Sequence, residues 1–216
     1  DDEGRPVPAA RAAVELALLD ASLRAYHRDI DAVVRWTSLP GFGSPASIRQ
    51  IPYSAVSASD DLAVTLRQLR LMYWGGLRHF KLKVGTPGDR ELLEHACHYL
   101  HRPLANDRAT LRIDANGVWS KESAIEWLSA TAHFPISAVE QPLPRGCEDE
   151  LPELLISLAE GTPRGLKPAA RIFVHDESLV TIDDAQRLIK LGVADAFNIR
   201  ISKCGCLIPS LRLAAL

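Results

Sequence analysis

The segments FKLKVG (residues 80–85), IDANG (113–117) and VEQP (139–142) decide the fold, because each is a short apolar run that carries or ends in charge. Between them, residues 89–100 and 121–132 have the composition and spacing of helices. Short strands that alternate with helices at a step of about 30 residues are typical of βα units. This part of the chain therefore predicts an α/β fold with a parallel sheet.

The same alternation extends toward both ends of the chain. Strands are expected at residues 51–57, 79–84, 111–114, 137–140, 172–176 and 196–201. Helices are expected at residues 61–74, 89–100, 121–132, 150–158, 182–191 and 207–216. Upstream, Pro8 and the apolar spacing through residues 9–26 favour one more helix. The Gly-, Pro- and Ser-rich stretch 36–45 favours a loop.

Ionisable residues lie at the carboxyl ends of four consecutive expected strands: Lys81 and Lys83, then Asp114, Glu140 and Asp176. The active site of a (β/α)8 barrel is built at that end of its strands. Parallel strands are covered on both faces, so buried charges there are costly unless they are paired or bind a metal. Three carboxylates on successive strands therefore predict a bound cation, and hard oxygen ligands suit Mg2+ better than zinc or copper.

The two lysines indicate a base. Lys81 and Lys83 are two residues apart, so a strand places both side chains on one face. A free lysine, with a pKa of about 10.4, is a poor base at neutral pH. A neighbouring cation or metal disfavours the ammonium form and lowers that pKa. The pair beside Mg2+ therefore indicates a neutral lysine that removes a proton next to a carboxylate group, with the metal holding the enediolate oxygens.

Each of these residues also has a simpler interpretation. The three carboxylates could stabilise the helices that follow them, because Asp and Glu favour helix N-termini. The two lysines could be a solvated pair on an edge strand. The interpretation as a site is favoured because the neighbours of both lysines in the sequence are apolar, so that the face would otherwise bury charge without a purpose.

Five segments in this order resemble the enolase superfamily, and most closely its subgroup of muconate lactonizing enzyme, o-succinylbenzoate synthase and dipeptide epimerases. They are residues 80–85, 113–117, 139–142, 176–178 and 198–205, and the resemblance extends over residues 9–216. It implies a (β/α)8 TIM-type barrel that is incomplete here, with about six βα units and without strands seven and eight. It also implies that residues 1–47 are a remnant of an N-terminal α+β capping domain with its linker, and that residues 48–216 are the partial barrel.

The resemblance assigns roles to individual residues. Asp114, Glu140 and Asp176 match the Mg2+ ligands of that family, Lys83 matches its catalytic base and Lys81 matches the partner lysine. The implied reaction is Mg2+-dependent abstraction of a proton alpha to the carboxylate of a small substrate, through a metal-stabilised enediolate.

Two residues beside these motifs receive no such role. Asn116 matches a residue near the metal-site loop, without a defined function. Glu177 follows a predicted ligand and would face the other way along a regular strand. We therefore expect no metal contact from Glu177.

The sixth expected strand departs from the family pattern. The lysine of an Asn-Ile-Lys sequence falls on Arg200, and Lys203 lies three residues later with the opposite strand parity. Because arginine is effectively always protonated, it cannot act as an ordinary acid–base partner. Lys83 as the only base, with Arg200 as electrostatic stabiliser, favours syn dehydration or cycloisomerisation of the o-succinylbenzoate synthase or muconate cycloisomerase type. Epimerisation of dipeptides or N-acyl amino acids is the alternative if Lys203 turns inward, and a non-catalytic fragment or degenerate family member is the third hypothesis.

Composition argues against several other classes of protein. The 216 residues are 47% hydrophobic with a formal net charge of -2, which does not favour binding to nucleic acid or to a membrane surface. An apolar run of about 18 residues, as a membrane span needs, does not occur, and the start does not have the pattern of a signal peptide. Four scattered cysteines predict a reducing, cytoplasmic location rather than a disulfide scaffold. The resemblance further implies a homo-oligomer.

Overall fold

The computed structural model describes residues 7–42, 51–57, 59, 61–160 and 172–216. The chain divides into two compact units. The first, which we call the sheet unit, comprises Ile51–Ser178 and Lys190–Ala196. The second, the helical unit, comprises Asp1–Gln50, Leu179–Ile189 and Phe197–Leu216. No helix among the described residues is long and apolar enough to cross a membrane.

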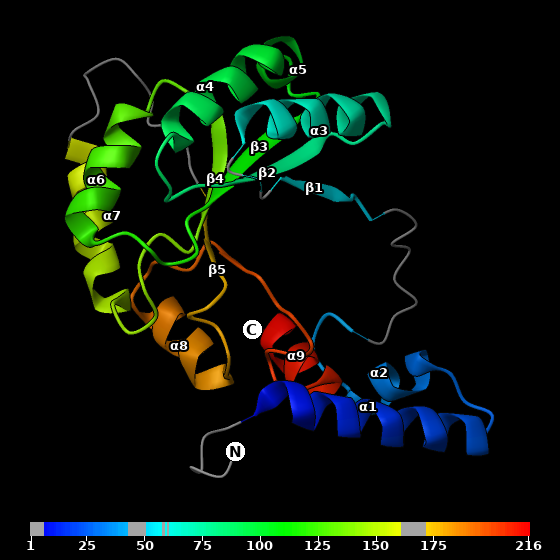
Figure 1. The fold of residues 1–216 in the computed structure, drawn as a ribbon. Helices are drawn as coiled ribbons and strands as arrows, with labels where there is room; N and C mark the ends of the chain where they lie inside the picture. The colour runs from blue at the N-terminus through cyan, green and yellow to red at the C-terminus, as the bar shows by residue number, and fades with distance from the viewer. Residues whose placement is uncertain (1–6, 43–50, 58, 60, 161–171) are drawn as a thin grey trace. The chain divides into compact units, whose positions relative to one another are not determined.

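Strands and helices alternate along most of the chain (Figure 1). The strands are β1 (Ser54–Ser57), β2 (His79–Lys83), β3 (Thr110–Asp114), β4 (Ile136–Glu140), β5 (Ile172–His175) and β6 (Ala196–Phe197). The helices between them are α3 (Leu62–Trp74), α4 (Asp89–Tyr99), α5 (His101–Ala105), α6 (Lys121–Ala130), the 3-10 turn η1 (Glu148–Glu150), α7 (Leu151–Glu160) and α8 (Ile182–Lys190). The chain begins with α1 (Pro8–Ala25) and α2 (Ile30–Thr37) and closes with α9 (Leu207–Ala214).

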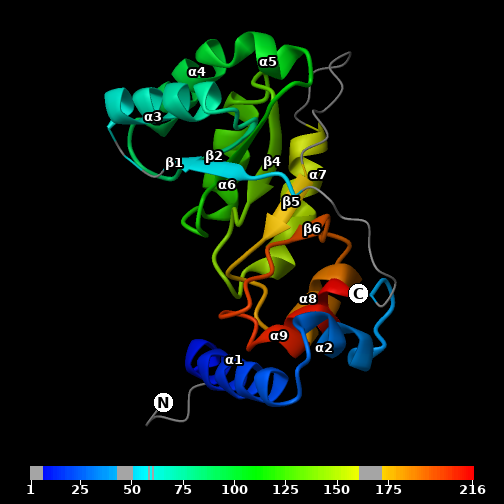
Figure 2. The same cartoon turned by 90° about the vertical axis from the view of Figure 1, so that its right-hand side faces the viewer.

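The sheet is wound in the order of the sequence, β1-β2-β3-β4-β5-β6, and β1 to β5 pair in parallel. Because βα crossovers are right-handed, a sheet that always advances in one direction carries its helices on one face. Figure 1 and Figure 2 show α3, α4, α6 and α7 on one side of the strands. This arrangement is that of a partial (β/α) barrel, so the predicted fold class is confirmed.

The two faces of the sheet differ in chemistry. The face toward the helices is apolar and buried, with exposures of 0–1% for Phe80, Leu82, Leu111, Ile113 and Val139. Each such side chain contributes roughly 1.5–3 kcal/mol by leaving water. The residues of alternate parity on β2 and β3 are polar or ionisable, and the register places Lys81 beside Arg112 and Lys83 beside Asp114. The charged side chains of β2 and β3 therefore lie on the face that these helices do not cover.

Several boundaries differ from the sequence predictions. The loop expected at 36–45 begins later, because Trp36 and Thr37 still belong to α2, which the sequence analysis missed. The N-cap of that helix is Asp29, whose side chain accepts a hydrogen bond from the Ala32 backbone N–H at 3.0 Å. The sixth strand, expected at 196–201, ends at Phe197. From there the chain turns, and the Arg200 carbonyl accepts hydrogen bonds from the backbone N–H groups of the third and fourth residues after it.

The helical unit joins the N-terminal helices to the last part of the chain. Its core contains Leu179, Ala185, Cys204 and Leu213, all at most 3% exposed. The Cys206 thiol lies 3.7 Å from the Ala12 carbonyl oxygen of α1 and donates to it. The four cysteines are free thiols. That residues 1–47 are a remnant of a capping domain stays a prediction.

Asp89 stabilises the turn that follows β2 through hydrogen bonds. Its side chain is buried and accepts hydrogen bonds from the Gly85 backbone N–H at 2.7 Å and from the Trp127 indole N–H at 3.0 Å. Gly85 has a φ of +99°, in the left-handed region that favours glycine. Asp89 therefore connects the β2–α4 turn to α6.

We expect Asp89→Ala to lower the free energy of unfolding by about 2–3 kcal/mol, because it leaves the buried Trp127 indole N–H and the part-buried Gly85 backbone N–H without their acceptor. The control is Trp127→Phe, which removes one donor, keeps most of the ring and should cost about 1 kcal/mol. Urea denaturation of both variants measures the difference. Equal stability of the two variants would show that the hydrogen bonds of Asp89 do not stabilise the turn.

Candidate active site

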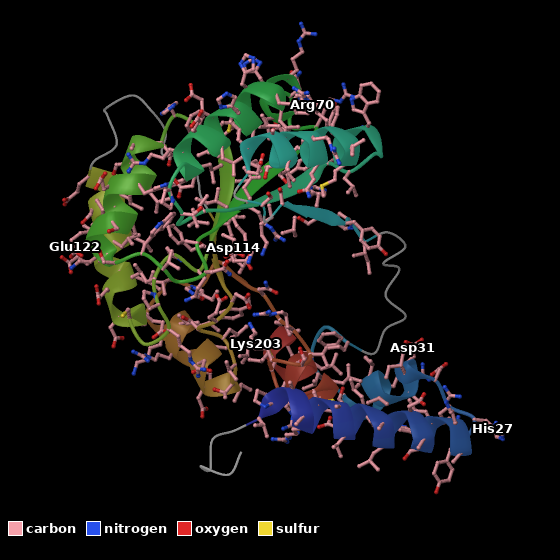
Figure 3. All side chains as sticks on the ribbon, in the orientation of Figure 1. His27, Asp31, Arg70, Asp114, Glu122 and Lys203 are labelled. Carbon is pink, nitrogen blue, oxygen red and sulfur yellow. The ribbon has the colours of Figure 1, made fainter. Side chains whose placement is uncertain are left out.

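The carboxyl ends of the central strands carry the predicted carboxylates. Asp114 is the last residue of β3 and Glu140 the last residue of β4, and the two are partners in the register of the sheet. Lys83, the last residue of β2, is the register partner of Asp114 on its other side. Asp176 comes directly after the last residue of β5. Figure 3 shows Asp114 at the end of its strand, whereas Glu122 of α6 points outward.

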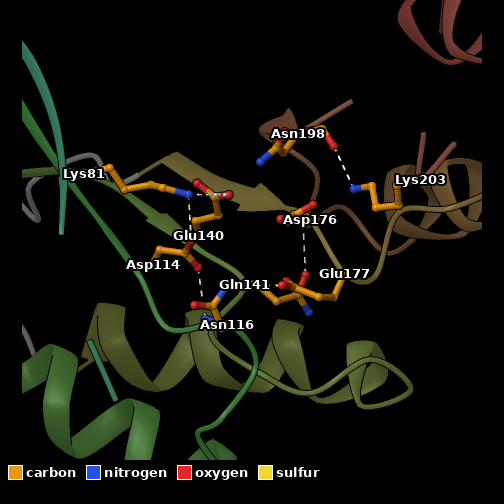
Figure 4. Close-up of polar contacts among 9 residues, drawn as sticks. All are labelled: Lys81, Asp114, Asn116, Glu140, Gln141, Asp176, Glu177, Asn198 and Lys203. Carbon is orange, nitrogen blue, oxygen red and sulfur yellow. Dashed lines mark hydrogen bonds and ion pairs between the residues drawn. The ribbon is translucent and has the colours of Figure 1, made fainter. Parts of the chain in front are cut away.

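Lys81 lies between the first two carboxylates (Figure 4). Its Nζ donates to Asp114 Oδ2 at 2.7 Å and to Glu140 Oε1 at 3.2 Å. The three side chains are 12%, 2% and 0% exposed, respectively. Charges withdrawn from water to this degree need partners of opposite sign. One ammonium group contacts both carboxylates.

The pKa of Lys81 is raised above its usual value. Burial lowers this pKa, but the hydrogen bond from Lys81 to Asp114 and the charges of Asp114 and Glu140 outweigh the effect of burial. Lys81 is therefore held as an ammonium ion between its carboxylates. The neutral lysine expected from the sequence cannot be Lys81 in this state, because a group with a raised pKa keeps its proton.

Lys83 shares the face of Lys81 but not its environment. The alternation of β2 buries Phe80 and Leu82 on the opposite face and leaves Lys83 exposed at the strand end. The prediction that the two lysines lie on one face is therefore confirmed by the backbone. Lys83 is the more accessible of the two for a small molecule.

Asp176 is placed by a loop rather than by the sheet. It is 4% exposed, and its backbone N–H donates to the Gln141 side-chain oxygen at 3.1 Å. Within the described part of the chain, no three His, Cys, Asp or Glu side chains are grouped so that they could hold a metal ion. The structure thus brings Asp114 and Glu140 together around Lys81, and it does not complete a three-carboxylate cluster with Asp176.

The donor chemistry nevertheless fits a hard divalent cation. Carboxylate oxygens at the ends of neighbouring strands are ligands of the type that Mg2+ binds. Asp114 and Glu140 supply such oxygens at the ends of β3 and β4. The role of Asp114, Glu140 and Asp176 as ligands stays a prediction.

The loops after the strands contain polar residues to which the sequence analysis gave no role. Asn116 donates from its side-chain Nδ2 to Glu177 Oε1 at 3.2 Å, and its backbone N–H donates to Asp114 Oδ1 at 3.0 Å. β5 ends at His175, so strand alternation does not govern Glu177, and its side chain contacts the loop after β3. Gln141 connects the loops after β4 and β5. The only signal in the sequence was the position of these polar residues directly beside the predicted ligands.

Arg200 and Lys203 belong to the helical unit. The Lys203 Nζ donates to the Asn198 carbonyl oxygen at 2.8 Å, and Arg200 is exposed in the turn that follows β6. Because β6 ends at Phe197, the strand parity used to separate Arg200 from Lys203 does not apply to them. Their roles in catalysis stay predictions.

We expect Lys81→Met to lower the free energy of unfolding by about 3–5 kcal/mol, because it leaves two buried carboxylates without their ammonium partner. Combining it with Asp114→Asn should cost less than the sum of the two single changes, since the amide needs no counter-charge. A double-mutant cycle measured by urea denaturation gives the coupling. Strict additivity would mean that the ion pair does not stabilise this cluster.

Comparison with known proteins agrees with the fold. The family model described as Enolase C-terminal domain-like matches residues 64–216, more than half of the chain. A hydrophobic dipeptide epimerase of Roseobacter litoralis is 29% identical over 209 residues, which are 96% of this chain and 54% of the relative. Chloromuconate cycloisomerases also match. The chain spans about half the length of the curated relatives it matches.

Solved structures give the same result. The crystal structure of muconate lactonizing enzyme from Pseudomonas fluorescens, complexed with muconolactone, is 25% identical, with a TM-score of 0.76 over 99% of this chain and 52% of that chain. The crystal structure of a dipeptide epimerase from Cytophaga hutchinsonii, complexed with Mg and the dipeptide D-Ala-L-Val, is 26% identical, with a TM-score of 0.62 over 76% of this chain and 41% of that chain. The resemblance found in the sequence is confirmed: the chain belongs to the Enolase C-terminal domain-like family.

Proposed function

We propose that the chain carries the metal-binding and base-bearing part of an enzyme that removes a proton alpha to the carboxylate of a small substrate. The observation that carries this proposal is the buried Lys81–Asp114–Glu140 cluster at the carboxyl end of consecutive parallel strands. Buried charge at that end of a barrel-type sheet is costly to fold and is typical of an active site. Lys83, exposed on the same face, supplies the base.

Asp114, Glu140 and Asp176 would hold Mg2+, with Asp176 joining the first two from the loop after β5. All three offer hard oxygen donors, and Asp114 and Glu140 are adjacent in the register. The dipeptide epimerase of C. hutchinsonii was solved with Mg and a dipeptide, which supports the choice of metal. When bound, the cation supplies positive charge that stabilises the negative charge developing on the substrate carboxylate.

Lys81 and Lys83 have different roles in the proposed reaction. Lys81 donates hydrogen bonds to Asp114 and Glu140 and keeps its proton, as its raised pKa indicates. Lys83 Nζ accepts the α-proton, because it is the accessible amine on this face of β2. The Lys81 ammonium orients the two carboxylates and preserves the positive charge near the reacting group.

The class of reaction depends on which residue assists Lys83, and the roles of Arg200 and Lys203 in it stay predictions from the sequence. With Arg200 as a permanent cation, one base suffices and the product is that of a syn dehydration or a cycloisomerisation. With Lys203 as a second base, the outcome is epimerisation of a dipeptide or N-acyl amino acid. The relatives support both candidates, since they include dipeptide epimerases and chloromuconate cycloisomerases. A homo-oligomeric state and a cytoplasmic location stay predictions from the sequence.

Mg2+ should raise the melting temperature of the chain. At about a hundred times its dissociation constant, a ligand stabilises the folded state by roughly 2.7 kcal/mol, which is about 5–10 °C for a chain of this length. Asp114→Asn should abolish the shift. A wild-type chain without a shift would favour the hypothesis of a non-catalytic fragment.

Lys83→Met should abolish exchange of the substrate α-proton with solvent, because it removes the accepting nitrogen while leaving the carboxylates in place. Proton NMR in D2O, with D-Ala-L-Val as probe and Mg2+ present, follows the loss of the α-proton signals. The Mg2+-dependent thermal shift serves as the control and should persist in this variant. Exchange at the wild-type rate in Lys83→Met would refute the base assignment, and inversion at the α-carbon in the wild type would favour the epimerase.

A further inference from the structure

Gln141 occupies a strained and fully enclosed position directly after Glu140. It is 2% exposed, and its φ of +40° lies in the left-handed region, which a residue with a side chain adopts only when its surroundings enforce it. Its backbone N–H donates to the Val174 carbonyl at 2.9 Å, and its carbonyl accepts from the Gly117 N–H at 2.7 Å. The backbone of Gln141 therefore connects the ends of β3, β4 and β5.

The side-chain amide of Gln141 uses all of its hydrogen-bonding capacity. Oε1 accepts from the backbone N–H groups of Asp176 and Ser178, both at 3.1 Å. Nε2 donates to the Leu143 carbonyl and to the Ser178 hydroxyl, both at 2.7 Å. Backbone N–H groups can only donate and a carbonyl can only accept, so these partners fix which end of the amide is oxygen. Figure 4 shows Gln141 beside Asp176.

These contacts determine where Asp176 can lie. The β5 ladder ends at His175, so the sheet itself does not position the next residue. The Gln141 oxygen instead holds the N–H of Asp176 and, two residues later, that of Ser178. We propose that Gln141 is the positioning residue of the third carboxylate, fixing the Asp176 loop to the strand that carries Glu140. This inference rests on the metal site proposed above.

A second contact restrains the same loop from the other side. Asn116 donates to Glu177, the residue between the two that Gln141 holds. Glu177 Oε2 is buried and has no hydrogen-bond partner among the described residues. The hydrogen bond between Asn116 and Glu177 therefore joins the Asp176 loop to the loop after β3. Glu177 thus supports the position of Asp176 without being a ligand.

Other side chains at position 141 cannot make the same contacts. Methionine has nearly the volume of glutamine but would leave the N–H groups of Asp176 and Ser178 and the Leu143 carbonyl without partners. Asparagine keeps the amide but is one methylene shorter, so it cannot reach both loops. Removal of residues that orient metal ligands typically weakens metal affinity by 10- to 100-fold.

The experiment measures Mn2+ binding to the full 216-residue chain by electron paramagnetic resonance, since Mn2+ takes the same hard oxygen ligands. Gln141→Met should raise the Mn2+ dissociation constant about 10- to 100-fold. Ser178→Ala removes one of the four side-chain hydrogen bonds of Gln141 and keeps both bonds from backbone N–H groups, so it should raise the dissociation constant less than Gln141→Met does. Leu69→Ala, on the buried face of α3, should lower the melting temperature without changing the dissociation constant. Gln141→Asn replaces Gln141→Met if the latter does not fold.

Hydrogen exchange followed by NMR gives a readout that needs no metal. The amides of Asp176 and Ser178 should be protected in the wild type and in Leu69→Ala, and should exchange freely in Gln141→Met. Free exchange in the wild type would overturn the assignment.

The binding outcomes separate the two proposals. Equal Mn2+ affinity of wild type and Gln141→Met, with binding lost in Asp114→Asn, would overturn the role of Gln141 and leave the metal site standing. A wild-type chain that binds no Mn2+ would overturn the metal site and, with it, this role of Gln141.

Discussion

The structure of the sheet unit depends on how buried carboxylates are neutralised. Asp114 and Glu140 lie side by side at the ends of adjacent strands and are almost inaccessible to water. Without a cation between them, their repulsion and lost hydration would oppose folding. Lys81 supplies this cation from β2. The same attraction to the two carboxylates stabilises the Lys81 ammonium and raises its pKa.

The rest of the unit maintains this charged face. Apolar residues of the same strands turn toward the helices and supply the hydrophobic stabilisation that permits charge on the other face. Sequential winding of the sheet keeps the helices to one side, so the charged face is not covered by the helices of its own βα units. The loops add hydrogen bonds from Gln141 and Asn116, which hold residues that the ladder no longer constrains. Stability and site geometry are thus supplied by different parts of each βα unit.

The elements built by regular periodicity were predicted well. β2, β3 and β4, with α4 and α6 between them, lie within one or two residues of their expected ranges, because apolar alternation and helical spacing are local properties. The prediction failed where the local pattern was ambiguous. The stretch 196–201 is apolar enough for a strand, yet it pairs only over Ala196–Phe197 before the chain turns. α2 was missed because its Gly-, Pro- and Ser-rich flank suggested a loop.

The sequence by itself determined the class of the fold, the face on which Lys81 and Lys83 lie, and the strand ends that carry the carboxylates. All of these follow from periodicity and from spacing along the chain. Only the tertiary structure decided that Lys81 joins Asp114 and Glu140, and that Gln141 holds the loop of Asp176. These contacts join residues that are 33 to 59 positions apart in the sequence. Their partners are chosen by strand register and loop conformation, which a local pattern does not encode.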